Sequence, residues 1–409
     1  MGRLGNLRLG SIAGIGIDVD WSLLIIFFLI TFSLAVGVFP AWHPDWSPIL
    51  SWTMALAAAV LFFTSVLAHE LSHALVGRAK GVQIGRITLF IFGGMAHMER
   101  EPPSWRAEFW MAIVGPLTSL VLGFGFLWLA ALVSGPLEIN PDDPGAALAA
   151  LGPTATLLAW LGPINILLGL FNLVPGFPLD GGRVLRAMIW GATGNLRLAT
   201  RWASRAGQGF ALLLMATGLV MMLGMQVPFF GGGFVNGLWL AFIGWFLNAM
   251  AGMSYRQLLI DESLGHVPVR QLMQTRFTRI DPLLRIRTLI DEHLMPSGQR
   301  AFPVEDDGQF LGMVSLTDLR KCASSQWPST IVSEIMTPVS ALVTVTPDQD
   351  AGDALALLGQ RDLNQLPVIE NNALVGLLRR EDIVKWLSLH AGAELTGDED
   401  LRHRARVPG

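Results

Sequence analysis

The segment HELSH, from His69 to His73, places two histidines and a glutamate in an apolar stretch that runs from Thr64 to Gly77. Ionisable groups are costly in such surroundings unless something neutralises them. On a helix, residues i and i+4 share one face, so the two imidazoles can bind one Zn²⁺ while Glu70, the next residue, reaches the metal-bound water. The segment therefore predicts a hydrolytic zinc site. The alternative is a pair of hydrogen-bonded histidines between helices.

Catalytic zinc normally has three protein ligands and one open position, so a third ligand is expected at the same depth as the histidines. The one cysteine, Cys322, belongs to a later, polar part of the chain and does not qualify. Asp180, in FNLVPGFPLDGGR, is the favoured candidate, because the neighbouring prolines and glycines would interrupt a helix and direct the carboxylate. His97 is the alternative ligand.

The elements that position these residues belong to a membrane protein. The 409 residues are 52% hydrophobic and only 15% charged, with a mean hydropathy of +0.50, which is too apolar for an ordinary soluble protein. The apolar character ends near Met253, and the chain from Ser254 onward has ordinary charge density. A net charge of -4 and the lack of a basic tract argue against nucleic-acid binding.

Six apolar segments are long enough to cross a bilayer, which takes about 20 residues of helix. They cover residues 21–39, 49–76, 109–134, 148–174, 207–226 and 229–252. The loops after the first, third and fifth segments contain no Lys or Arg, whereas those after the second and fourth contain five each. The positive-inside rule therefore predicts a multi-pass cell-membrane protein with both termini, the HELSH end of the second span and the polar region on the cytosolic side.

One segment, Ile84 to Arg100, is rich in β-branched and aromatic residues and is too short to span the membrane as a helix. The pair Gly93 and Gly94 between its two apolar arms predicts a β-hairpin that dips into the cytosolic face. Non-helical backbone at that depth is tolerated only against protein or a wet cavity. The hairpin would present an open strand edge near the histidines.

The motifs HELSH, FNLVPGFPLDGG and VGPLTS (Val114 to Ser119) together resemble those of the site-2 protease family of intramembrane zinc metalloproteases. The resemblance covers about residues 1–250. It implies one Zn²⁺ per chain, held by His69, His73 and Asp180.

The same resemblance implies roles for further residues. Glu70 would be the general base, and Asn172 would help to position the substrate or the oxyanion. The hairpin with Gly93 and Gly94 is similar to the membrane-reentrant strands with which the family receives a locally unwound substrate. The implied partners are the lipid bilayer and a membrane-embedded protein, for example a transcription-factor precursor, an anti-sigma factor or a signal-peptide remnant.

The polar region contains an internal repeat. AFPVEDDGQFLGMVSLTDLRKC, which starts at Ala301, aligns with QLPVIENNALVGLLRREDIVKW, which starts at Gln365, at a period of 64 residues. The shared order of strand, turn, strand and amphipathic helix resembles a pair of cystathionine-β-synthase (CBS) domains over about residues 267–390.

In CBS pairs, a Gly-x-x-Ser/Thr-x-x-Asp motif can hold the ribose and a phosphate of an adenine nucleotide. The first repeat keeps this motif as Gly312, Ser315 and Asp318, whereas the second has Arg379 in place of the hydroxyl and retains only Asp382. The resemblance therefore implies an adenine nucleotide as a second ligand of this protein. The alternative is a purely structural module that forms a homodimer.

These patterns predict a polytopic α-helical membrane protein of about six spans, with a short membrane-reentrant β-hairpin, followed by a cytosolic α/β CBS-pair domain. The predicted parts are a membrane domain at 1–253, a linker at 254–266, CBS repeats at 267–325 and 326–390, and a polar tail at 391–409. The predicted function is an intramembrane zinc endopeptidase for regulated intramembrane proteolysis, modulated by the CBS pair. The alternative is a CBS-regulated membrane transporter or channel with a buried His/Glu metal site.

Overall fold

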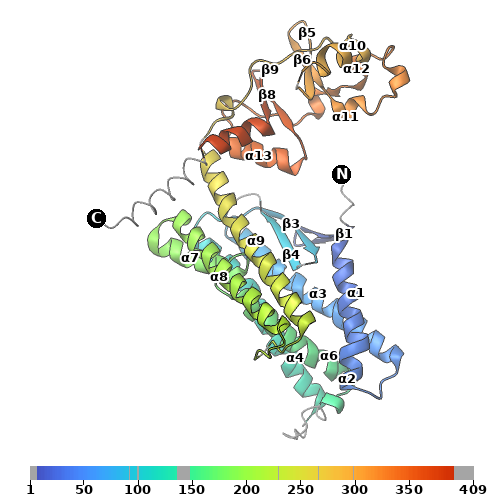
Figure 1. Ribbon diagram of the computed structural model, residues 1–409, viewed down its shortest axis with the longest axis vertical. Coiled ribbons are helices and arrows are strands. Elements are labelled where there is room, and N and C mark those ends of the chain that lie inside the picture. The colour runs from blue at the N-terminus through green and yellow to red at the C-terminus, as the bar shows by residue number, and fades with distance from the viewer. Residues whose placement is uncertain are drawn as a thin grey trace. The chain divides into compact units, whose positions relative to one another are not determined.

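The computed structural model describes residues 7–91, 93–98, 101–135, 148–228, 230–265, 267–297 and 299–390, with only the backbone described at 96, 97, 261 and 262. The predicted polar tail at 391–409 lies outside these residues. The chain forms two compact units, Met1–Tyr255 and Arg256–Gly409, each with hydrophobic cores of its own (Figure 1).

The first unit is built on long apolar helices. They are α1 (Ser22–Ser33), which continues through a wider turn (Leu34–Val38) into α2 (Phe39–Trp42), then α3 (Pro48–Ala79), α4 (Trp105–Ser134), α6 (Pro153–Asn172), α8 (Leu196–Met222) and α9 (Phe234–Leu264). In the described part of the chain they provide six candidate membrane spans, so the predicted number is confirmed. Large apolar side chains such as Leu24, Phe28 and Val121 point outward, as expected for helices surrounded by lipid.

A further helix, α7 (Asp180–Thr193), corrects one prediction. The basic loop expected after the fourth span is instead largely helical, since it contains α7 and the first turns of α8. With 14 residues, α7 is too short to cross a bilayer, so a search for apolar spans does not detect it. It begins with an acidic residue, Asp180, and ends at Gly194, whose left-handed backbone (φ 69°) terminates the helix.

Four strands form a sheet in the order β1-β2-β3-β4. They are β1 (Leu7–Ile12), β2 (Ile15–Val19), β3 (Ile84–Phe90) and β4 (Gly93–Met98). β2 and β3 are parallel, and the other neighbours are antiparallel. The predicted hairpin is formed by β3 and β4, but Gly93 and Gly94 are the first residues of β4 rather than the turn. The sequence patterns did not predict β1 and β2, which extend the sheet on the side away from β4.

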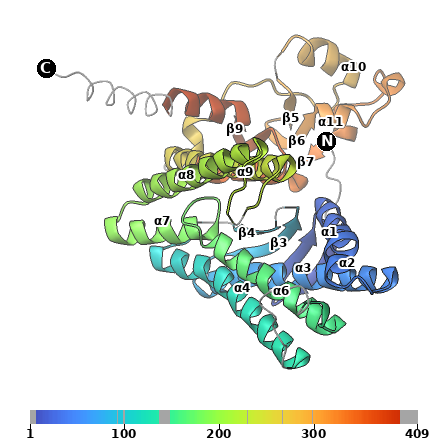
Figure 2. The ribbon, with the colours of Figure 1, turned by 60° about the horizontal axis from the view of Figure 1, so that its bottom comes forward.

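The sheet packs against the part of α3 that carries HELSH. β3 and β4 lie beside α3 (Figure 2). Apolar side chains from β2, α3, β3 and α4 form one cluster, which includes Ile15, Val66, Ile87 and Met111. Each of these side chains is at most 6% exposed. Because Val66 lies three residues before His69 on α3, burial of this cluster holds the histidine-bearing turns against the sheet.

The second unit contains the same hairpin twice. β5 (Ala301–Asp306) pairs with β6 (Gln309–Ser315), and β8 (Gln365–Glu370) pairs with β9 (Ala373–Arg379), both antiparallel. Val304 lies opposite Gly312 in the first hairpin, and Val368 lies opposite Gly376 in the second, each just before a register shift. The predicted 64-residue repeat is therefore present in the backbone pairing.

Short elements complete each repeat around its own core. They are α10 (Ile286–Thr288), a wider turn (Leu289–Leu294), α11 (Leu316–Leu319), α12 (Val332–Ile335), β7 (Thr337–Pro338), α13 (Ala351–Gln360) and a helix at 380–390. Phe302 and Val314 are buried in the first core, and Leu366 and Leu378 in the second. The expected linker at 254–266 is helical as far as Leu264, because α9 continues through it.

Candidate metal centre

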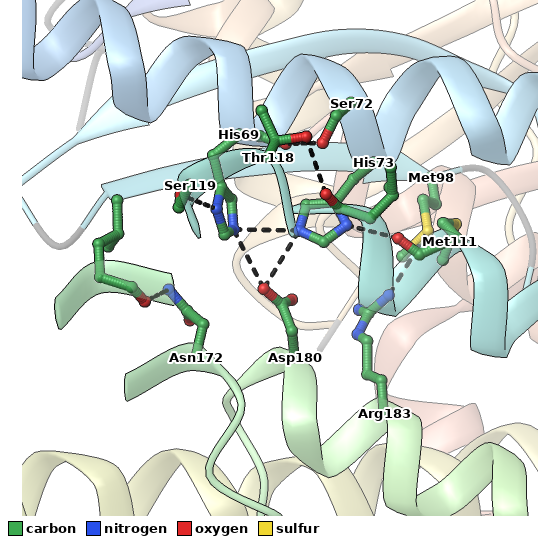
Figure 3. Close-up of polar contacts among 12 residues, drawn as sticks. His69, Ser72, His73, Met98, Met111, Thr118, Ser119, Asn172, Asp180 and Arg183 are labelled. Carbon is green, nitrogen blue, oxygen red and sulfur yellow. Dashed lines mark hydrogen bonds and ion pairs between the residues drawn. The ribbon is translucent and has the colours of Figure 1, made fainter. Parts of the chain in front are cut away.

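Three side chains from two separate helices converge at the end of α3. His69 Nε2 and His73 Nε2 each lie 3.1 Å from Asp180 Oδ2, and the two Nε2 atoms lie 3.1 Å from each other (Figure 3). The side chains of His69, His73 and Asp180 are 4%, 12% and 20% exposed, so the cluster is largely buried and Asp180 is its most exposed member. The structure thus brings together the three residues that the sequence resemblance implied as zinc ligands.

The geometry of this cluster suits a zinc ion. In a tetrahedral site with bonds of about 2.0–2.1 Å, the ligand atoms lie about 3.3 Å apart, which is close to the three distances found here. Two imidazole nitrogens and one carboxylate oxygen form the donor set of a catalytic zinc with a fourth position open.

Two groups on α4 orient the imidazoles. His73 Nδ1 lies 2.6 Å from the Met111 carbonyl oxygen and must donate to it, because a carbonyl can only accept. The neutral ring then keeps the lone pair on Nε2, where a metal requires it. His69 Nδ1 lies 2.8 Å from the hydroxyl of Ser119, which is fully buried. Sequence reasoning assigned no role to Met111 or Ser119, although Ser119 is the last residue of the VGPLTS motif.

Gly115, in the same motif, allows α4 to approach the histidines. A Cβ atom at this position would lie 2.1 Å from His73 Nε2 and 2.8 Å from His69 Nε2. Any side chain here would overlap the two imidazole rings, so glycine is required for close approach. The signal in the sequence was the motif itself, but its spacing alone does not reveal this contact.

The loop before α7 sets the position of Asp180. α6 ends at Asn172, and Asp180 is the first residue of α7 rather than part of the end of the fourth span. A Cβ atom at Gly181 would lie 2.3 Å from the Leu173 carbonyl oxygen, so the first turn of α7 sits directly on this loop. The amide of Phe177 donates to the Ala203 carbonyl of α8 at 3.1 Å, which fixes the other side of the loop.

Glu70 lies against the edge strand of the sheet. A Cβ atom at Gly94 would lie 2.2 Å from Glu70 Cγ and 2.7 Å from its Cδ, so β4 can pass the glutamate only because residue 94 is glycine. At Gly93 an added Cβ atom would have no neighbour within 4 Å, but the φ of 124° is one that other residues rarely adopt. Glycine is therefore required here by the backbone conformation at the start of β4. Arg183, one turn after Asp180, donates to Met98 Sδ at 3.8 Å and links α7 to the far end of β4 (Figure 3).

Two further residues from the sequence analysis are less closely tied to the cluster. Asn172 lies beside it in Figure 3, and its amide donates to the Leu168 carbonyl of its own helix at 3.0 Å. His97 lies on β4 in register with Arg86, and its side chain is outside the described part of the structure.

In the first CBS repeat, the predicted nucleotide-binding residues bond to each other. The backbone amide and hydroxyl of Ser315 donate to Asp318 Oδ2 at 3.0 and 2.7 Å and cap helix α11. Lys321 donates to Asp318 Oδ1 at 2.8 Å, and Asp318 is buried. These contacts occupy both oxygens of the Asp318 carboxylate.

The second repeat presents a cavity beside its aspartate. This cavity of about 570 Å³ is lined by Gln274, Ser297, Gln299, Arg379, Glu381, Asp382 and Lys385. Arg379 donates to both oxygens of Asp382, at 2.8 Å from Nε and 2.7 Å from Nη2, and this bonding raises the pKa of the guanidinium. Arg379 therefore pairs with the carboxylate that the sequence analysis assigned to a ribose.

Comparison with known proteins agrees with both units. Residues 57–216 match peptidase family M50, and residues 269–325 and 332–389 each match the CBS domain. The chain is 34% identical to Rip3 of Mycobacterium tuberculosis over 95% of this chain and 94% of that protein. It is 35% identical to sll0528 of Synechocystis over 94% of this chain and 96% of that protein. Both relatives are named as candidate zinc metalloproteases.

More distant matches include the zinc metalloprotease MJ0392 of Methanocaldococcus jannaschii, which is 27% identical over 81% of this chain and 84% of that protein. The solved structure of a site-2 protease from the same organism is 27% identical, covers 61% of this chain and 95% of its own, and has a TM-score of 0.38. Since relatives above 30% identity align with nearly the whole chain, this protein belongs to peptidase family M50, the site-2 protease family of zinc metalloproteases, and carries two CBS domains.

Proposed function

We propose that this chain is a zinc-dependent intramembrane endopeptidase that hydrolyses a peptide bond in or near the transmembrane segment of a membrane protein. The observation that carries the proposal is the convergence of His69, His73 and Asp180 in a bundle of apolar helices, with Glu70 adjacent on the same helix. Membership of peptidase family M50 supports the type of reaction.

The chain's own groups supply proton transfer and orientation. A Zn²⁺ ion held by the three ligands would act as a Lewis acid that polarises the scissile carbonyl and lowers the pKa of a water molecule. Glu70 accepts a proton from the attacking water and returns it to the leaving amine. Met111 and Ser119 hold the two imidazoles in fixed orientations, so the ligands need not reorganise during the reaction.

The outer edge of β4 is our candidate for holding the substrate. A helical substrate uses its carbonyl groups in its own hydrogen bonds and has to unwind before one of them is attacked. An extended peptide can pair with the backbone of an edge strand. Because Gly94 of β4 abuts Glu70, a peptide on this edge would pass beside the base. We assign Gly93 to the path of this strand and Asn172, at the end of α6, to orienting the scissile carbonyl.

Exchange of the base for its amide tests this function. Glu70→Gln is expected to retain zinc and to abolish cleavage, because the amide cannot accept the proton. Zinc content and the peptide fragments of the membrane proteome are measured for cells with wild-type protein and with the variant. Glu292→Gln, an exposed exchange in the second unit, is the matched control. Unchanged fragments with Glu70→Gln, or ion flux that persists in that variant, would favour a transporter or channel instead.

We further propose that the amino terminus, the opening of the metal site and the CBS pair face the cytosol. The distribution of Lys and Arg between the loops supports this orientation. The single cysteine, Cys322, is partly exposed in the second unit and reports its side directly. A membrane-impermeant maleimide is expected to label inside-out vesicles but not intact cells, and Cys322→Ser is the control that removes the signal.

We assign the cavity beside Asp382 to an adenine nucleotide that modulates cleavage. Lys385 offers a positive charge for a phosphate, and Arg379 would have to release Asp382 for the carboxylate to meet a ribose. Titration of the full-length protein with ATP and AMP tests this assignment, with Asp382→Asn expected to weaken binding and Asp318→Asn to leave it unchanged. Loss of binding in Asp318→Asn alone would move the site to the first repeat.

We also assign homodimerisation to the CBS pair. Light scattering of the full-length protein measures whether it forms a dimer.

A further inference from the structure

A buried ion pair joins α7 to α4 outside the metal cluster. The side chains of Arg186 and Glu108 are 6% and 0% exposed. Arg186 Nε donates to Glu108 Oε1 at 2.5 Å, its Nη2 contacts the same oxygen, and Nη2 also donates to Glu101 Oε2 at 2.7 Å. Burial alone would lower the pKa of Arg186, but Glu108 and Glu101 raise it, so the guanidinium stays charged.

The composition of this pair indicates a role in geometry rather than in stability. Desolvation of two charges is costly, and a well-packed apolar pair of the same volume is often at least as stable. The second carboxylate oxygen, Glu108 Oε2, has no hydrogen-bond partner within the described residues, so the pair is not optimised for stability. What a guanidinium offers and an apolar side chain lacks is hydrogen bonding in fixed directions.

Both ends of the ion pair lie close to groups that hold the metal ligands. Glu108 lies one turn before Met111, whose carbonyl accepts the hydrogen bond from His73. Arg186 lies six residues after Asp180 on α7, which is about 9 Å along a helix axis. The ion pair therefore ties the helix of the carboxylate ligand to the turn of α4 that holds one of the imidazoles.

Arg186 also contacts the loop that leads into α7. Its guanidinium carbon lies 5.5 Å from the centre of the Phe177 ring, within the range of a cation–π interaction. A Cβ atom at Gly182 would lie 2.4 Å from the backbone nitrogen of Phe177, so the loop and the first turn of α7 are in direct contact. Arg186 thus fixes both the helix and the point at which it begins.

We propose that Arg186 and Glu108 are positioning residues that hold Asp180 within ligand distance of His69 and His73. The inference rests on the proposed metal site and adds the device that sets its third ligand. Arg186 and Glu108 act through Asp180 and are not ligands themselves. Their replacement should therefore change the affinity for zinc even where the protein stays folded.

The test measures zinc affinity of the purified full-length protein by competition with a chelator, with thermal unfolding followed in parallel. Arg186→Met is expected to weaken zinc binding about 10–100-fold, the usual effect of removing a group that orients a metal ligand. Because this variant leaves Glu108 unpaired and can unfold, the deciding variant combines Arg186→Met with Glu108→Leu, which replaces the pair by an apolar contact. We expect wild-type thermal stability with zinc affinity still at least about tenfold lower. Wild-type zinc affinity in this double variant overturns the proposal.

A conservative exchange covers the case in which the double variant does not fold. Arg186→Lys keeps the charge but cannot reproduce the forked contact, so weaker zinc binding is expected without a large loss of thermal stability. Wild-type zinc affinity in Arg186→Lys likewise counts against a positioning role.

Two controls distinguish the positioning role from general destabilisation and from the metal site itself. Thr156→Val removes a buried hydrogen bond of 2.8 Å to His43, a residue that precedes the first turn of α3 and so lies at the end opposite to HELSH. This variant should have lower thermal stability and unchanged zinc affinity. An equal loss of zinc in this control would show that any destabilisation weakens binding and would overturn the inference. Asp180→Asn tests the metal site itself. Undiminished zinc binding there refutes the site, whereas loss there with wild-type affinity in the Arg186 variants refutes only the positioning role.

Discussion

Gly115 provides the sharpest test of the metal centre, because one of its α-hydrogens faces the Nε2 atoms of His69 and His73. In Gly115→Ala the added methyl group would lie 2.1 Å from His73 Nε2 and 2.8 Å from His69 Nε2. The backbone of α4 is held by its contacts with α6 and α7, whereas the side chain of His73 on α3 can rotate if it gives up its hydrogen bond to the Met111 carbonyl. The imidazole of His73 is therefore the group that has to move.

The size of this movement predicts the effect. To regain a carbon–nitrogen contact of about 3.5 Å, the His73 ring has to shift by about 1.4 Å. Zinc sites tolerate deviations of only about 0.2 Å in ligand distance, so His73 can no longer serve as a ligand. Loss of one of three protein ligands should weaken zinc binding at least about 100-fold, which corresponds to about 2.7 kcal/mol.

Chelator competition on the purified protein, together with the zinc-to-protein ratio after dialysis, measures this change. Gly125→Ala is the matched control, since Gly125 lies on the same helix and an added Cβ would have no neighbour within 4 Å. The control should keep its zinc and gain slightly in stability, because alanine favours helix by about 1 kcal/mol over glycine. Wild-type zinc affinity in Gly115→Ala would refute the assignment of the two histidines to a common metal.

Three other predictions follow from individual contacts. Ser119→Ala removes the hydrogen-bond partner of His69 Nδ1 and should weaken zinc binding about 10–100-fold, as measured by chelator competition. Unchanged zinc affinity would mean that packing alone orients the imidazole ring. Gly94→Val places side-chain atoms where Glu70 lies, so kcat should fall while bound zinc is retained, and normal turnover would contradict the close approach of β4 to the base. Burial lowers the pKa of His43 below its usual value of 6.5, so the unfolded chain takes up a proton at a higher pH than the folded protein does. Thermal stability should therefore decline as the pH falls below about 6.5. In His43→Gln this decline should be smaller.

Local patterns in the sequence were sufficient for the features that depend on neighbours along the chain. The HELSH spacing places two imidazoles on one face of any helix, and the six apolar segments are long enough to cross a bilayer whatever they pack against. The 64-residue repeat is likewise visible without a structure, because the two copies share one residue pattern along the chain. The structure gives both copies the same hairpin register.

Features that depend on contacts between distant segments came only from the tertiary structure. β1 and β2 join the predicted hairpin across more than 60 residues, and α7 is amphipathic and too short to register as a span. Gly115 and the Arg186–Glu108 pair have no distinctive local spacing, since their importance lies in which atoms face them across the helix interface. The sequence by itself determined the chemical types gathered for a zinc site. Only the packing of α4 and α7 decided how those groups are held at ligand distance, because that distance depends on side chains that are far apart along the chain.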